Sequence, residues 1–204
     1  MSYLFTSESV SEGHPDKIAD QISDAILDAY LSIDPDSKVA CETLVTTDLV
    51  IISGEITSKA NINLVNIAKN VITEIGYTND AYLFSADTCR IETYIDKQSP
   101  DINQGVVSNK GLYKEEGAGD QGIMFGYACK DTESLMPAPI HYSHQILLKM
   151  AEARKNGSIN ELEPDSKSQV TMLYENGKPV KVTSVVVSTQ HKENFTPSQI
   201  KEVI

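Results

Sequence analysis

A polar loop in front of an expected helix combines residue types that could bind phosphate and a metal ion. Residues 8–17 read ESVSEGHPDK, with Pro15 suited to the first helical turn. The N-terminus of a helix favours anions through its free backbone N–H groups and its dipole. His14 adds a proton donor or phosphate contact, Asp16 a hard carboxylate suited to Mg²⁺, and Lys17 a positive charge. Charged residues also begin many helices that bind nothing, so this interpretation stays open.

A glycine-rich segment, residues 117–122 with the sequence GAGDQG, could bring the backbone against a ligand. Its three glycines remove the side chains that would hinder a close approach. Asp120 could accept a hydrogen bond from a nucleobase amine or a ribose hydroxyl. The segment is not a Walker A loop, because no Gly-Lys-Ser/Thr follows, and it is not GxGxxG after a strand. On composition alone, a flexible surface loop is the simpler interpretation.

A third candidate lies at the entry of an expected strand, where residues 165–170 read DSKSQV. Lys167 would be an exposed cation able to hold a phosphate group, and Asp165 would be a nearby hydrogen-bond acceptor. Solvated charges at the start of a strand are commoner than phosphate sites, so this segment does not decide the question by itself.

Two carboxylates in an expected hairpin form the fourth candidate. Glu42 is out of phase with the core-facing side chains of its strand and shares a face with Ala40 and Leu44. Apolar neighbours on that face favour a covered, paired or metal-bound carboxylate over a solvated one. Glu55 follows Gly54, which interrupts the return strand, and could point into a cleft.

The charge balance excludes several classes of partner. The 204 residues carry a formal net charge of −12 at pH 7. Sequence-independent nucleic-acid binding requires a basic footprint, and so does binding to an anionic membrane surface, so we expect neither partner. A polyphosphate ligand would need metal ions or a local cluster of Lys and Arg to offset this charge.

The chain shows no targeting signal. Its first ten residues have neither the basic region nor the apolar core of a signal peptide, and no apolar run is long enough to span a bilayer. The cysteines Cys41, Cys89 and Cys129 form no CxxC pair, which argues against zinc and favours buried, reduced thiols. We therefore expect a cytoplasmic protein.

The candidate residues must be positioned by elements that the hydrophobic pattern predicts. In the first half, apolar residues at three-to-four spacing predict helices over 15–33 and 62–75. Alternating residues predict a hairpin over 38–57, and a further strand is expected at 88–95.

The second half begins with a stretch, 97–122, that has no helical or strand period and is too long for an ordinary connection. A short apolar run predicts a strand at 123–129, and a helix is expected over 139–155. A hairpin follows at 167–188, with Asn-Gly at its turn, and a Thr-Pro pair opens a last helix at residue 196.

The order helix, hairpin, helix occurs twice, beginning at Pro15 and at Pro139. This order predicts an α+β protein built from repeated units, each an antiparallel sheet covered by helices, although chance similarity between two ordinary segments remains an alternative. The expected division is an N-terminal α+β domain at 1–101, an active-site loop and linker at 102–122, and a central α+β domain at 123–204, incomplete at its C-terminal end.

Taken together, these segments resemble one family. Residues 5–17, FTSESVSEGHPDK, are similar to the N-terminal signature of S-adenosylmethionine synthetases. Residues 117–128, GAGDQGIMFGYA, resemble the adenosine-binding hexapeptide and its flank, and 97–105, KQSPDINQG, resemble the mobile active-site loop. The segments DSKSQV at 165–170 and STQH at 188–191 also resemble family segments. The resemblance covers the whole chain in order and is closest to the bacterial type.

This resemblance implies a methionine adenosyltransferase. The methionine sulfur would attack C5′ of ATP and expel triphosphate, which is then cleaved to pyrophosphate and phosphate. His14 and Lys167 would act on the triphosphate as catalytic residues, and Lys17 would join them in binding ATP. Asp165 and Asp120 would help to place the adenosine and the methionine.

The remaining implied roles concern methionine, the mobile loop and the cofactors. Glu55, Gln98 and Asp120 would hold methionine. Gln98 and Ile102 would lie in the loop that closes over the site. The implied cofactors are Mg²⁺, bound by Asp16, and an activating K⁺, bound by Glu42.

The resemblance also implies a homodimer or a dimer of dimers with the site at the subunit interface. The third repeat of the fold is absent from these residues, so we expect them alone to bind ATP poorly and to turn over slowly or not at all. Two alternatives remain. One is a truncated, non-catalytic dimerising fragment of the same family, and the other is a nucleotide-binding protein of a different family.

Overall fold

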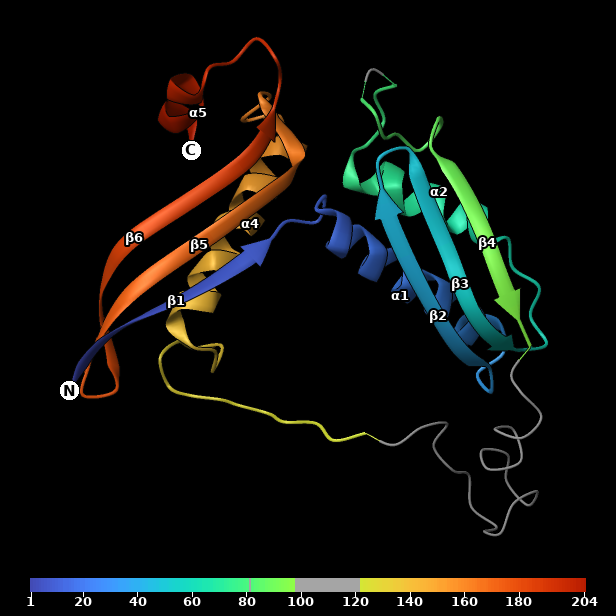
Figure 1. Cartoon of the computed structure of the whole chain (residues 1–204), viewed down its shortest axis with the longest axis horizontal. Helices are drawn as coiled ribbons and strands as arrows, with labels where there is room; N and C mark the ends of the chain where they lie inside the picture. Colours follow the sequence, from blue (N-terminus) through green and yellow to red (C-terminus); the bar gives the residue numbers. More distant parts are fainter. Residues whose placement is uncertain (81, 98–121) are drawn as a thin grey trace.

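The chain forms two α+β units that lie next to each other in the computed structural model, which describes residues 1–80, 82–97 and 122–204 (Figure 1). The elements run in the order β1 (Ser2–Val10), α1 (Pro15–Ile33), β2 (Lys38–Thr46), β3 (Leu49–Thr57), α2 (Leu64–Ile75), β4 (Arg90–Asp96), α4 (Ala138–Lys155), β5 (Leu162–Glu175), β6 (Lys178–His191) and α5 (Pro197–Val203). The mixed α+β class predicted from the sequence is confirmed.

The first unit packs α1 and α2 on one face of the sheet β2-β3-β4. Helix α1 buries a side chain about once per turn, at Ile18, Ile22, Ile26 and Tyr30, as the sequence period predicts. The hairpin of β2 and β3 is antiparallel, whereas β4 pairs with β3 in parallel after the crossover through α2. The sheet is therefore mixed and not purely antiparallel, which is a correction to the expected antiparallel unit.

The second unit is the sheet β1-β5-β6, covered on one face by α4. Alternate residues of β5 are buried, from Leu162 to Tyr174, and face the helix. At the tip of the long β5–β6 hairpin, Asn176 and Gly177 both have positive φ, at 51° and 76°. A two-residue turn with this geometry is the one that an Asn-Gly pair favours, so the predicted turn is confirmed.

Strand β1 belongs to the second sheet, although it precedes the whole first unit in the chain. It pairs antiparallel with β5 over its full length, from Ser2 opposite Glu175 to Val10 opposite Lys167. In the predicted division of the chain, these residues belong to the N-terminal domain 1–101. Because β1 lies in the second sheet, the chain crosses between the units immediately before α1 (Figure 1).

The prediction of a strand at 123–129 is wrong. Residues 122–129 form no regular element, and the large apolar side chains of this run are 78–94 % exposed. These side chains are Ile123, Met124, Phe125 and Tyr127. A short apolar run becomes a strand only when it finds a sheet edge, and this one does not reach one. None of the described helices is long and apolar enough to cross a membrane.

Candidate functional site

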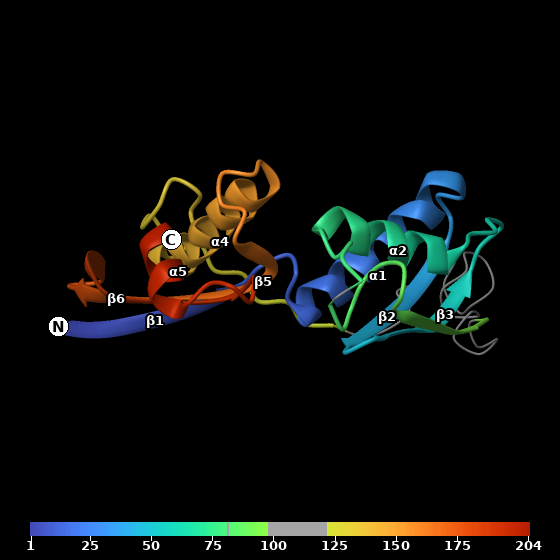
Figure 2. The same ribbon diagram turned by 90° about the horizontal axis from the view of Figure 1, so that it is seen from above.

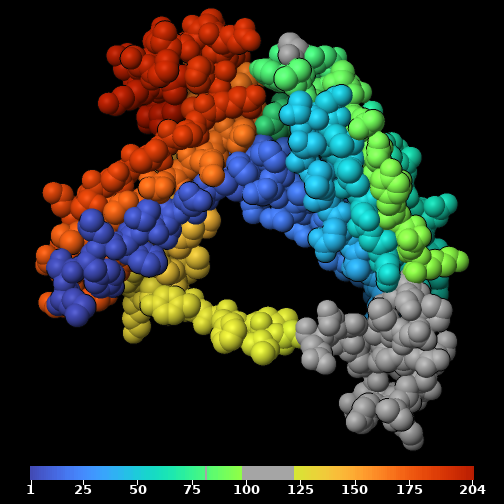
Figure 3. All heavy atoms as spheres, in the orientation of Figure 1, coloured from blue at the N-terminus to red at the C-terminus, as the bar shows by residue number. Residues whose placement is uncertain are grey.

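The loop between β1 and α1 is held against the start of β5, where the two units meet (Figure 3). The backbone N–H of Ser11 donates to Ser166 O at 2.8 Å, and its side chain donates to Pro164 O at 2.7 Å. The Ser11 hydroxyl also accepts from the Ser166 N–H at 2.7 Å. All three bonds are buried or lie at buried residues, so they fix the loop to β5.

The next residues of this loop are packed equally closely. A Cβ on Gly13 would lie 2.4 Å from the Cβ and carbonyl carbon of Pro164, so only glycine fits here. The Gly13 carbonyl accepts from the hydroxyl of Tyr77, which follows α2, at 2.7 Å. Tyr82 likewise donates to Glu163 of β5 and links the units a second time.

His14 caps the N-terminus of α1. Its Nδ1 accepts a hydrogen bond from the backbone N–H of Asp16 at 3.2 Å and lies 3.7 Å from the carboxylate of that residue. When Nδ1 accepts, the proton of a neutral imidazole sits on Nε2, which is then free to donate to a ligand. The Asp16 side chain is 89 % exposed, so its carboxylate is open to a cation or a metal-bound ligand.

Asp165 lies half-buried on β5 beside this cap. Burial raises the pKa of its carboxyl, and the nearby charges of His14 and Lys167 act in the opposite direction. Lys167 itself is exposed, opposite Val10 on one side and Ser188 on the other. The fold thus groups an imidazole, a carboxylate and an ammonium from two separate elements, and this group can contact an anion and its counter-cation.

A cavity of about 310 Å³ opens beside Asp165, between the start of α1 and the loops of the first unit. Its lining includes Gly13, Tyr77 and Gln190, and the Oε1 atom of Gln190 is buried without a hydrogen-bond partner among the described residues. Gln190 belongs to the family-like segment 188–191 but has no predicted role. Tyr77 was not predicted, because the sequence offers no signal for it beyond its place after a helix.

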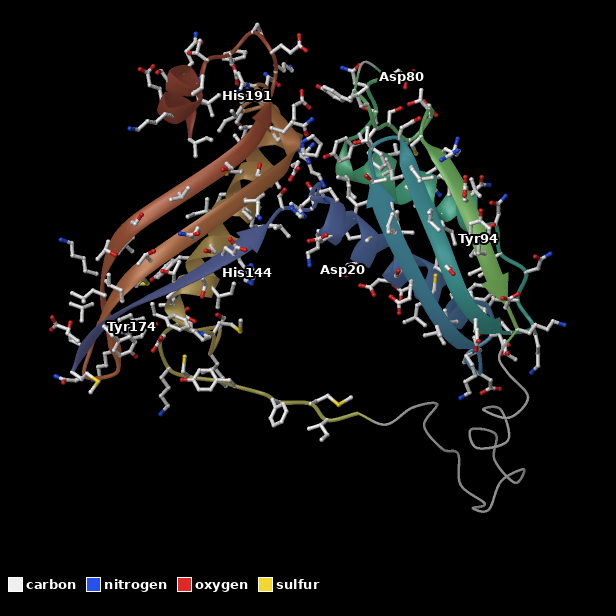
Figure 4. All side chains as sticks on the ribbon, in the orientation of Figure 1. Asp20, Asp80, Tyr94, His144, Tyr174 and His191 are labelled. Carbon is white, nitrogen blue, oxygen red and sulfur yellow. The ribbon has the colours of Figure 1, made fainter. Side chains whose placement is uncertain are left out.

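Lys17 is oriented differently from the other predicted phosphate ligands. Its ammonium pairs with Asp20 on the same helix at 3.2 Å. Burial lowers the pKa of His144 on α4, and the charges of Lys17 and His141 lower it further. Figure 4 shows His144 and Asp20 on different units. Lys17 is therefore held along α1 by Asp20, and its charge acts on His144 of the other unit.

Glu42 and Glu55 lie on the face of the first sheet that no helix covers. Glu42 is opposite Ser53, and Glu55 is opposite Ala40, so the two carboxylates are diagonal neighbours on adjacent strands. Both side chains are exposed. Of the covered, paired or metal-bound states expected for Glu42, cover by an element of this unit is not found, because both helices pack on the other face.

Three predicted site residues, Gln98, Ile102 and Asp120, lie outside the described residues. Across residues 1–80, 82–97 and 122–204, no three His, Cys, Asp or Glu side chains converge as a metal-ligand set.

Two family models match successive parts of the chain. Residues 2–100 match the model of the S-adenosylmethionine synthetase N-terminal domain, and residues 115–204 match that of the central domain. Among curated relatives, the S-adenosylmethionine synthase of Desulfosudis oleivorans is 54 % identical over 203 residues, which are 100 % of this chain and 52 % of the relative.

Two further relatives carry the same name. The S-adenosylmethionine synthase of Syntrophobacter fumaroxidans is 52 % identical over 100 % of this chain and 52 % of its own length. That of Sorangium cellulosum is 52 % identical over 99 % of this chain and 48 % of its own length. The chain spans about half the length of the curated relatives it matches, and it belongs to the S-adenosylmethionine synthetase family.

Proposed function

We propose that the protein containing this chain is a methionine adenosyltransferase, in which the methionine sulfur attacks C5′ of ATP and the expelled triphosphate is cleaved to pyrophosphate and phosphate. The observation that carries the proposal is the grouping of His14, Asp165 and Lys167 at the junction of the two units. The names of the relatives add support, because they are S-adenosylmethionine synthases.

The chemistry explains the residue types. Sulfur is already nucleophilic, so the reaction needs no strong base, but the leaving triphosphate carries several negative charges. Lys167 offers a positive charge, and His14 offers a proton on Nε2, both of which stabilise charge on phosphate oxygens. Asp165 and Asp120 would accept hydrogen bonds from the adenosine or the methionine ammonium. Lys17 would add a positive charge from the first turn of α1.

Mg²⁺ fits the exposed carboxylate of Asp16, because this ion is commonly held by one or two carboxylates together with substrate phosphates. When bound, it would neutralise phosphate charge. The described residues of this chain offer fewer ligands for the activating K⁺. Glu42 supplies one exposed carboxylate with Glu55 diagonal to it, so further ligands would come from outside these two strands.

We also propose that Glu55 and Gln98 recognise methionine and that Ile102 lies in a closing loop. Glu55 lies on the uncovered face of the first sheet, away from the junction. We therefore propose a homodimer, or a dimer of dimers, in which this face of one subunit supplies carboxylates to the junction of another.

The uncovered faces support such an association. Both sheets turn their uncovered faces to the same side of the molecule, at the lower edge of Figure 2. Large apolar side chains are exposed there, including Leu4 at 61 %, Leu44 at 54 %, Tyr94 at 59 % and Val186 at 51 %. Large apolar side chains exposed on one side of a folded chain favour an interface on that side.

These same faces favour the second candidate, a non-catalytic dimerising module. The two candidates share an interface and differ in whether the junction binds substrate. The catalytic candidate further implies a cytoplasmic enzyme supplied with ATP and L-methionine.

Incubation with ATP, isotopically labelled methionine, Mg²⁺ and K⁺, followed by mass spectrometry for S-adenosylmethionine, tests the proposal. We expect slow, Mg²⁺-dependent formation of labelled product that is lost in His14→Asn and kept in Lys149→Met, a change at an exposed pair on α4. A dimer that forms no product and binds no triphosphate would contradict the proposal and favour the module.

A further inference from the structure

Arg154, near the C-terminal end of α4, joins three elements through one guanidinium group. Its Nη2 atom donates to Glu12 Oε1 at 2.6 Å and to Ile75 O at 2.7 Å. Glu12 precedes α1, and Ile75 is the last residue of α2. The side chain of Arg154 is only 13 % exposed, and that of Glu12 is 23 % exposed, so solvent screens this ion pair less than a surface pair.

The end of α2 is shaped to receive this guanidinium. Gly76 caps the helix in the left-handed region, with φ of 115°, and a Cβ at this position would lie 2.5 Å from Arg154 Nη1. The last carbonyls of a helix lack partners within the helix and favour a cation. Arg154 therefore satisfies the Ile75 carbonyl at a place where only glycine leaves room for it.

Glu12 is held from every side. Its second carboxylate oxygen, Oε2, accepts from Lys155 Nζ at 2.6 Å, and its backbone carbonyl accepts from Gln21 Nε2 at 2.8 Å. The neighbouring Gly13 carbonyl is bound by Tyr77. His14 follows within two residues, so its backbone cannot shift while these bonds are intact.

We propose that Arg154 is a positioning residue that fixes His14 relative to Asp165 and Lys167 by tying Glu12 to the ends of α2 and α4. The use of His14 in this statement rests on the proposed function. The Nη2 group of Arg154 donates to two protein acceptors, Glu12 Oε1 and Ile75 O, so in this proposal the residue acts through the loop. Arginine suits the task because it offers several donors in one rigid plane, whereas lysine offers a single, mobile ammonium.

Hydrogen exchange of the 204-residue chain tests the structural half of the proposal without requiring activity. The variants are Arg154→Met, Arg154→Lys and the control Lys149→Met, which removes an exposed ion pair from the same helix. We expect Arg154→Met to speed exchange in residues 11–18 by about tenfold, because hydrogen bonds to a charged group are lost. Exchange in the hairpin 38–57 should stay unchanged, and Arg154→Lys should recover part of the protection.

Binding of Mg²⁺-tripolyphosphate, followed by calorimetry, tests the functional half. We expect Arg154→Met to weaken this affinity by about tenfold and Arg154→Lys to restore part of it, which a general loss of stability would not do. Glu12→Gln should reproduce the loss, and the Arg154→Met/Glu12→Gln double variant should be no weaker than either single variant.

The outcomes separate the two hypotheses. Exchange at 11–18 that equals wild type in both Arg154→Met and Glu12→Gln would overturn the positioning role, and so would faster exchange with unchanged tripolyphosphate affinity. If wild type binds no tripolyphosphate, the proposed function is contradicted, and faster exchange in both variants would still support Arg154 as the residue that holds the loop. If Arg154→Met also loses protection at 38–57, the variant has unfolded. Exchange at 11–18 and tripolyphosphate affinity of Glu12→Gln then decide whether the positioning role holds.

Discussion

The two units of this chain differ in how completely their sheets are covered. In the first, α1 and α2 bury one continuous core against β2, β3 and β4. In the second, α4 is the main cover of the sheet, the buried residues fall into two small clusters, and the outer strand β6 exposes valines such as Val185 at 51 %. The proposed site lies at the junction of the two units, which we call the seam. His14 comes from the well-packed unit, and Asp165 and Lys167 come from the open one.

This difference teaches how the site is built. A rigid helix fixes the direction of the His14 cap, and a strand of the open unit brings charged groups to it. The seam itself is made by short polar contacts of a few residues, not by a shared core.

The largest expected loss of stability comes from a substitution in the core of the better-packed unit. Ile22 of α1 is fully buried, so Ile22→Ala should lower the free energy of unfolding by about 2–5 kcal/mol. Val185→Ala on β6 should change it by less than about 0.5 kcal/mol, because this side chain is half exposed. Denaturant unfolding measures both, and equal losses would refute the contrast between the units.

A smaller effect is expected at the seam. Gly13→Ala places a methyl group against Pro164 and should cost about 1–3 kcal/mol by overpacking. Gly126→Ala is the matched control, since a Cβ at that position meets nothing within 4 Å. Thermal unfolding compares the two variants, and a Gly13→Ala protein as stable as its control would show that the seam tolerates displacement.

Ser11→Ala should cost less, about 1–2 kcal/mol, because it removes one side-chain donor and one acceptor at buried partners. Ser134→Ala, at an exposed hydroxyl, serves as its control. Chemical denaturation should show the loss for Ser11→Ala alone, and the account of the seam fails if both serines are equally dispensable.

The smallest effect is a contrast in pH dependence between one carboxylate of each unit. Asp34 ends α1, and the Lys59 N–H holds its pKa below the usual value, so its stabilising contribution is present above the unfolded pKa and is lost as pH falls through the folded one. Burial raises the pKa of Asp165, so its contribution is present below the unfolded pKa and is lost as pH rises through the folded one.

Asp34→Asn should therefore destabilise the chain at pH 7, and this loss should shrink as the pH falls through the folded pKa of Asp34. Asp165→Asn should stabilise the chain at pH 7, with the gain fading toward acid. Melting temperatures over this pH range test both signs, and parallel pH profiles for the two variants would rule out the opposite environments described for these carboxylates.

The local elements were predictable because their signals are local. The helical period of α1, the Asn-Gly turn between β5 and β6, and the Thr196 cap of α5 are each read within a few residues, and each is confirmed. Long-range pairing has no such signal. Nothing in residues 2–10 indicates that their partner is 162–175, and the parallel placement of β4 is equally invisible in its own pattern.

The site was predictable in its charged residues but not in what holds them. His14, Asp165 and Lys167 were identified from their residue types and their family-like segments. Arg154 and Tyr77 were not, because a helical arginine and a tyrosine after a glycine resemble many surface residues until the fold brings them to the loop. The exposure of Glu42 could not be predicted because the pattern of one strand does not show which face of the sheet the helices will cover.

Calorimetry of tripolyphosphate with Mg²⁺ tests most directly the claim that the seam binds the triphosphate of ATP. The account predicts binding by the wild-type chain, a loss of about tenfold or more in Lys167→Met, and no comparable loss in Lys181→Met, which removes an equal charge from an exposed position on β6. No binding by wild type, or equal weakening by the two lysine variants, would contradict it.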